Sequence, residues 1–88
     1  MGRHSKTFWR ILGGRSDANL AFSDLRGVLL HLGFIERIRG SHFIFHHEGM
    51  EEILNLQTFG DKAKPYQVKQ VRNLLLKYKL GTNDDISL

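Results

Sequence analysis

The feature that most constrains this fold is a glycine–serine pair between two runs of strand-forming residues. Residues 34–39 and 42–48 are rich in isoleucine, phenylalanine and other residues that favour extended structure. Gly40 and Ser41 separate the two runs, and glycine in the first position of a two-residue turn suits type II′ geometry. The runs are therefore predicted to pair as an antiparallel hairpin. A turn at 49–50 and a third strand over 51–57 extend the hairpin to a three-stranded sheet.

Helical periodicity marks the sequence on both sides of this sheet. Before it, Ser23 is the expected N-cap of a helix that closes at the glycine in position 33. The apolar residues of that helix recur at spacings of three and four: Leu25, Val28, Leu29 and Leu32. After the sheet, Pro65 suits the first turn of a helix over 66–80. Its apolar stripe contains Val68, Val71, Leu75 and Tyr78.

The order of elements predicts the fold class. A short helix over 6–12 comes first and ends at a pair of glycines. We therefore expect an α+β two-layer domain, with two main helices on one face of the three-stranded antiparallel sheet and the short helix added at the N-terminus. With 88 residues, the chain has room for one core. The predicted divisions are an N-terminal extension over 1–21, the domain itself over 22–81 and a flexible tail over 82–88.

Composition narrows the classes of function. The formal net charge is +4, which favours an anionic partner, most commonly nucleic acid; the alternative is a basic surface that only aids solubility. The chain has no cysteine, which excludes disulfides, thiolate metal sites and a cysteine nucleophile. No apolar run approaches the ~20 residues that cross a bilayer, and no apolar signal core follows the N-terminus. We expect a cytoplasmic protein without a membrane contact.

The cluster of histidines at 42, 46 and 47 invites a metal site, but strand geometry argues against one. His42 and His46 share a face of the second strand yet lie ~13 Å apart at ~3.3 Å per residue. His46 and His47 point to opposite faces of that strand. We therefore expect neither a metal nor another cofactor. Phe43 and Phe45 share the face opposite His42, and we assign them to the core; the alternative is that they stack on bases of a nucleic acid.

His42 has the setting of a catalytic residue. It opens a strand directly after the turn, where a rigid sheet holds a side chain in fixed geometry. An imidazole can accept or donate a proton near neutral pH, and neighbouring cations can stabilise charge on a phosphate. Arg37 and Arg39 supply such cations on the preceding strand. The alternatives are a histidine that satisfies the amides of the turn and one that only contacts RNA.

An ordered set of short motifs resembles the HicA family of toxins. The residues that carry this resemblance are Leu32-Gly33-Phe34, then Gly40-Ser41-His42 at the start of a strand, then Lys64-Pro65 before the last helix. The similarity extends over roughly 22–80. It implies a fold like the double-stranded-RNA-binding domain, metal-independent cleavage of mRNA and pairing with a HicB-type antitoxin. It also implies that His42 is the catalytic histidine.

Two positions depart from the family pattern. Many members have a second histidine where this chain has Phe43, and many have a histidine before the last helix where this chain has Phe59-Gly60. The departures leave open which group acts as the second acid or base. In the implied mechanism His42 takes the proton of the ribose 2′-hydroxyl, a group that DNA lacks. The residues expected to contact RNA are Arg37, Arg39, Ser41, Lys62, Lys64, Lys69 and Arg72.

Three hypotheses follow from these observations. The first is an endoribonuclease toxin, the second is a non-catalytic RNA-binding module of the same fold, and the third is a protein-interaction domain whose basic charge is incidental. Only His42 separates the first from the second, because a protein that merely binds RNA does not need it.

Overall fold

The fold was examined in a computed structural model, which describes residues 3–80. The elements in chain order are α1 (Arg3–Gly13), the 3₁₀ turn η1 (Asp17–Asn19), α2 (Phe22–His31), β1 (Ile35–Arg39), β2 (His42–His46), β3 (Leu54–Leu56), β4 (Thr58–Phe59), β5 (Lys62–Ala63) and α3 (Pro65–Lys77). The predicted α+β class is confirmed. The tail predicted over 82–88 and the glycine at 81 lie outside the described residues.

Strands β1, β2 and β3 form the predicted antiparallel sheet in that order, and each is shorter than expected. The turn between β1 and β2 has Gly40 at φ +58°, whereas Ser41 does not have a positive φ. That combination distinguishes type II′ from type I′ and confirms the predicted turn. The turn sets the pairing of Arg39 with His42, and along β2 it brings Phe43 opposite Leu56 of β3.

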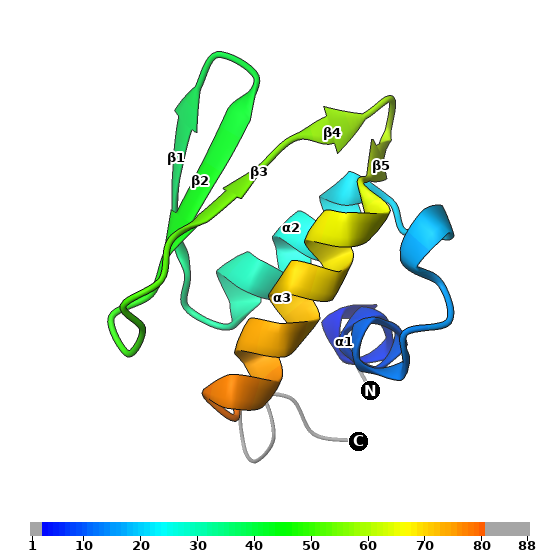
Figure 1. Ribbon diagram of the computed structural model, residues 1–88, viewed down its shortest axis with the longest axis horizontal. Helices are drawn as coiled ribbons and strands as arrows, with labels where there is room; N and C mark the ends of the chain where they lie inside the picture. Colours follow the sequence, from blue (N-terminus) through cyan, green and yellow to red (C-terminus); the bar gives the residue numbers. More distant parts are fainter. Residues whose placement is uncertain (1–2, 81–88) are drawn as a thin grey trace.

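One face of this sheet carries the core. Helices α2 and α3 lie on the same side of the sheet (Figure 1). Their apolar stripes meet Phe45, Leu54 and Leu56, which are all fully buried, while Phe43 is partly buried against Phe22 of α2. The assignment of Phe43 and Phe45 to the core face is thus confirmed. The opposite face has no helix over it in Figure 1 and carries His42, Ile44 and His46.

Helix α1 belongs to the same core. It begins at Arg3, three residues before the predicted start, and packs on α2 and α3 on the side away from the sheet (Figure 1). Phe8 and Ile11 are buried there among residues of the main domain. Gly27 of α2 permits the close approach, because a Cβ at this position would lie 2.8 Å from the ring of His4. The N-terminal segment is therefore part of the packed structure.

The start of α2 differs from the prediction. The helix begins at Phe22, with Ala21 in the N-cap position, so Ser23 lies inside the first turn and does not cap it. Ala21 forms a β-bridge with Lys62, and the backbone N–H of Phe22 donates to the carbonyl of Asp61 at 2.9 Å. A tertiary backbone contact fixes the start of the helix, and this contact overrides the side-chain preference of serine.

The segment between β3 and α3 contains a small hairpin. Strands β4 and β5 pair antiparallel, with Thr58 opposite Ala63 and Phe59 opposite Lys62. Ala63 is buried, and its N–H donates to the carbonyl of Leu20 at 2.9 Å. The predicted helix over 66–80 begins one residue earlier and ends at Lys77. Among the described helices, none is long and apolar enough to cross a membrane.

Candidate active site

His42 is the first residue of β2 and lies on the uncovered face of the sheet. Its position follows from the type II′ turn, which places it directly opposite Arg39 at the turn end of the hairpin. Residues paired across antiparallel strands share a face, so the exposed side chains of His42 and Arg39 lie on the same side of the sheet. Arg37, two residues earlier, shares this face and is also exposed.

Both ring nitrogens of His42 have a partner on or next to β3. Nδ1 lies 2.8 Å from Oδ1 of Asn55, and Nε2 lies 3.4 Å from Nε2 of Gln57. The carbonyl oxygen of the Gln57 side chain in turn accepts a hydrogen bond of 3.0 Å from Nζ of Lys64. The imidazole is therefore held between two amide side chains, and one of these is joined to a lysine.

These contacts define the tautomer of His42. An amide oxygen can only accept, so Nδ1 must carry the proton that it donates to Asn55. Nε2 is then the unprotonated nitrogen, and its lone pair accepts from the amide N–H of Gln57. Every donor in the series from Lys64 through Gln57 and His42 to Asn55 meets an acceptor. The arrangement leaves His42 with its basic nitrogen at the surface.

A buried glutamine of α3 holds the strand that carries both partners. The Gln67 side chain is 5% exposed, and its Oε1 accepts from the backbone N–H of Gln57 at 3.0 Å. Its Nε2 donates to the backbone carbonyl of Asn55 at 3.3 Å. Gln67 thereby makes hydrogen bonds with the backbone groups at the edge of β3, as a neighbouring strand would. These bonds hold the backbone on both sides of Leu56.

Four of the predicted RNA-contacting residues lie at this end of the molecule. Arg37 and Arg39 are on β1, Ser41 is exposed in the turn, and Lys64 is in the network described above. The turn between β1 and β2, the β4–β5 hairpin and the first turn of α3 all lie at one end of the fold (Figure 1). The residues come from distant parts of the chain and meet through the tertiary structure.

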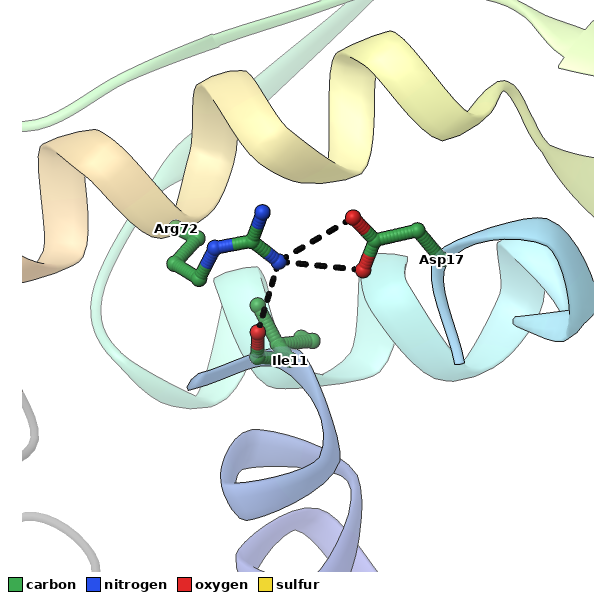
Figure 2. Close-up of polar contacts among 3 residues, drawn as sticks. All are labelled: Ile11, Asp17 and Arg72. Carbon is green, nitrogen blue, oxygen red and sulfur yellow. Dashed lines mark hydrogen bonds and ion pairs between the residues drawn. The ribbon is translucent and has the colours of Figure 1, made fainter. Parts of the chain in front are cut away.

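The other predicted cations lie elsewhere or have other partners. Lys62 of β5 donates to the side chain of Asn19 at 3.4 Å, and Lys69 is exposed on α3. Figure 2 shows Arg72 reaching from α3 to Asp17 and to the C-terminal part of α1. Its Nη1 lies 3.0 Å from Oδ1 of Asp17 and 3.1 Å from the carbonyl oxygen of Ile11. Arg72 therefore links three elements of the fold, and its charge is paired.

The remaining histidines have separate surroundings. His46 is exposed at the far end of β2, opposite Ile35. His47 makes two bonds: Nε2 lies 3.1 Å from the carbonyl oxygen of Leu32, and Nδ1 accepts from the N–H of Gly49 at 3.0 Å. His47 thus joins the end of β2 to the end of α2. Within residues 3–80, no three histidine, aspartate or glutamate side chains gather closely enough to bind a metal ion.

Asn55, Gln57 and Gln67 were not identified from the sequence. A signal for the first two exists, because Asn55 and Gln57 alternate with Leu54 and Leu56 in the third predicted strand. This alternation puts both polar residues on the face opposite the core, which is the face of His42. Gln67 gave no comparable signal, since a glutamine in the first turn of a helix is usually exposed.

The site lies on an open surface, and no enclosed pocket was found in the part of the chain that the structure describes. The uncovered face of the sheet that carries His42 is therefore accessible to a large ligand such as a polymer. Comparisons of the chain with known protein families, with curated proteins and with solved structures find no match. The resemblance to the HicA toxins therefore rests on the motif residues alone.

Proposed function

We propose that this protein is an RNA-cleaving toxin in which His42 acts as the general base. The observation that carries the proposal is the pair of contacts on the His42 ring, in which Nδ1 is bonded to Asn55 and the unprotonated Nε2 has only a long contact of 3.4 Å with the Gln57 amide. A base that removes a proton needs a fixed ring and an unprotonated nitrogen, and this arrangement supplies both.

The reaction follows from the chemistry of RNA. Nε2 of His42 accepts the proton of a ribose 2′-hydroxyl, and the 2′-oxygen attacks the adjacent phosphorus. The O2′–P bond forms, the bond between phosphorus and the 5′-oxygen breaks, and the leaving oxygen takes a proton from water. The products are a 2′,3′-cyclic phosphate and a free 5′-hydroxyl. DNA is not a substrate because it lacks the attacking group.

The fold supports an RNA partner. The order α2, β1, β2, β3, α3, with both helices on one face of the sheet, resembles the double-stranded-RNA-binding domain. The net charge of +4 favours a polyanion, and Arg37 and Arg39 lie on the same face as His42. Such contacts position the RNA backbone and read little sequence. A protein acting on mRNA in this way belongs in the cytoplasm.

A HicB-type antitoxin is the proposed protein partner. The face that carries His42 also has an isoleucine more than half exposed, Ile35 at 57%, opposite His46 at the other end of the strands. An apolar side chain on the same face as a cationic site suits a protein that covers this face and excludes RNA. An acidic partner on this face would neutralise Arg37 and Arg39.

Replacement of His42 by alanine tests the proposal. We expect cleavage of total RNA to fall about 10²–10⁴-fold, as for the loss of a general base, and growth arrest on expression to disappear. The free energy of unfolding should change by about 1 kcal/mol or less, since the side chain is exposed. His46→Ala is the matched control, because His46 lies on the same face of the same strand.

A folded His42→Ala protein that cuts RNA at the parent rate would exclude the mechanism. If the parent binds RNA without cutting it, the protein is a non-catalytic binding module. Thermal melting of each variant separates loss of activity from loss of fold.

A further inference from the structure

Gln57 lies between a base and a cation. Its carboxamide oxygen is 3.0 Å from Nζ of Lys64, and its carboxamide nitrogen is 3.4 Å from Nε2 of His42. Gln57 and Lys64 are half-buried, whereas His42 is exposed. A group that binds to Nε2 of His42 from solvent therefore meets the Gln57 amide and the Lys64 ammonium together.

The positive charge of Lys64 is held in place without a carboxylate. The three ion pairs found among residues 3–80 use Arg26, Arg72 and Lys77 as their cations. Lys64 donates to a neutral amide instead, so its full charge is available to an anion. It is also the N-cap residue of α3, where the positive end of the helix dipole adds to the field.

The bond between Gln57 and His42 is easily exchanged. At 3.4 Å it is longer than a typical N–H hydrogen bond, and its acceptor is neutral. A phosphoryl oxygen carries negative charge and makes a shorter and stronger hydrogen bond with the same N–H. An arriving phosphate would therefore take the Gln57 amide away from His42 and expose the lone pair of Nε2.

We infer that Gln57 and Lys64 bind the non-bridging oxygens of the scissile phosphodiester beside His42. This inference rests on the proposed function, and it assigns the groups that stabilise the transition state. As the 2′-oxygen attacks, negative charge grows on the non-bridging oxygens, and two donors already directed at them lower the barrier. When a phosphate binds, the Gln57 amide turns from His42 to the phosphate and uncovers the base.

The first test compares turnover in matched variants. Lys64→Met should lower kcat for an RNA oligonucleotide about 10²–10³-fold, the usual effect of losing one such donor. Lys6→Met removes the same charge from an exposed position on α1, outside the residues expected to contact RNA, and should change kcat little. Gln57→Glu puts a negative charge beside the phosphate and should lower kcat far more than Gln70→Glu, a matched change on the exposed surface of α3. Lys64→Arg should recover most of the lost kcat.

The second test does not depend on cleavage. A 2′-O-methyl RNA hexamer of mixed sequence has no free 2′-hydroxyl, so the protein can bind it but cannot cut it by the proposed route. In nuclear magnetic resonance titrations with this probe, the side-chain amide signals of Gln57 and the ring signals of His42 should shift together. The parent protein serves for this measurement, so the result does not depend on whether a variant folds.

Two results would overturn the inference while His42→Ala still abolishes cleavage. One is an equal effect of Lys64→Met and Lys6→Met on kcat in folded proteins. The other is an unchanged Gln57 amide signal at saturating hexamer. A parent protein whose Gln57 and His42 signals respond to the hexamer, but which does not cut RNA, would keep the phosphate site and remove the proposed cleavage.

Discussion

At the scale of single residues, the group that accepts the hydrogen bond from Nδ1 of His42 affects the proposed role of this histidine as a base. Asn55 accepts from Nδ1 with a neutral amide oxygen. Serine hydrolases use a carboxylate in the corresponding position, where it stabilises the imidazolium that forms during reaction. A neutral acceptor fixes the same tautomer without favouring the protonated ring.

Asn55→Asp is expected to move the pH dependence of cleavage. The new carboxylate lies 2.8 Å from the ring nitrogen in the parent geometry and favours the protonated imidazole. A base works only when unprotonated, so the acidic limb of the pH–rate profile should move to higher pH by about one unit or more. The measurement is the initial rate of RNA cleavage between pH 5 and 9, roughly the range in which histidine titrates.

Asn73→Asp adds the same charge at an exposed position of α3 and is the control for the Asn55 variant. If both variants shift the acidic limb equally, the shift reports net charge alone. In that case Asn55 has no role in positioning His42.

At the scale of elements, α3 is held at three points along its length. Gln67 bonds to β3 near its start, Arg72 bonds to α1 and η1 in its middle, and Lys77 reaches Glu52 at its end with Nζ 2.6 Å from Oε2. Each contact joins α3 to a segment at least ten residues away in sequence. The helix thereby sets the positions of β3 and α1 together.

Arg72→Met should weaken the fold and leave the chemistry intact. The arginine side chain is 16% exposed, and its loss leaves Asp17 without its cation and the carbonyl of Ile11 without this donor. We expect a loss of about 1.5–3 kcal/mol in the free energy of unfolding, as for hydrogen bonds to charged groups. Lys69→Met, which removes an exposed cation of the same helix, should change that free energy by about 0.5 kcal/mol or less.

Denaturant titration of both proteins makes this comparison, and the cleavage rate is measured well below the midpoint. Equal stability of the two variants would contradict the linking role of Arg72. A folded Arg72→Met protein with impaired RNA affinity would show that Arg72 contacts RNA as well.

At the scale of the whole molecule, the two faces of the sheet carry different kinds of side chain. The inner side is apolar, and its one charged residue on β1, Glu36, is paired with Arg26 of α2 through bonds of 2.6 and 2.7 Å. The outer side carries Arg37 and Arg39 on the strand next to His42, and neither forms an ion pair with another residue of the range 3–80. The core and the face that carries the proposed chemistry are thus opposite, so substitutions on the outer face need not damage the core.

The stability of the molecule at acid pH should depend on Glu52. Hydrogen bonds from Lys77 and then from Tyr78 lower the pKa of Glu52 from 4.5 to about 2. A carboxyl group with a lowered pKa stabilises the fold above its unfolded value and loses that contribution as the pH falls through the folded value. The melting temperature of the parent should therefore fall between about pH 4.5 and about pH 2.

Glu52→Gln should melt at a lower temperature than the parent at pH 7, and the difference should shrink as the pH approaches 2. Glu48→Gln, an exposed change in the same region, should follow the parent throughout. A difference between Glu52→Gln and the parent that stays constant with pH would exclude a contribution from the ionised carboxylate.

The sequence by itself determined the features that depend on neighbouring residues. Alternation and the glycine of a two-residue turn are local properties, so they placed His42 at the start of a strand, opposite Arg39 and away from the core. Periodicity likewise located α2 and α3. The start of α2 was misplaced at Ser23 because the backbone of Asp61, 39 residues from Phe22, supplies the contact that begins the helix.

Only the tertiary structure decided which side chains surround His42. Seven residues separate β2 from β3, and nothing local in that segment specifies which residue of β3 faces the histidine. The bonds of Asn55 and Gln57 to His42 depend on this register, and the register is held by Gln67 from another element. Arg72 shows the same limit, because its partner Asp17 is 55 residues away. The sequence shows that a helix carries a charged side chain. Which residue pairs with that charge depends on how distant segments pack.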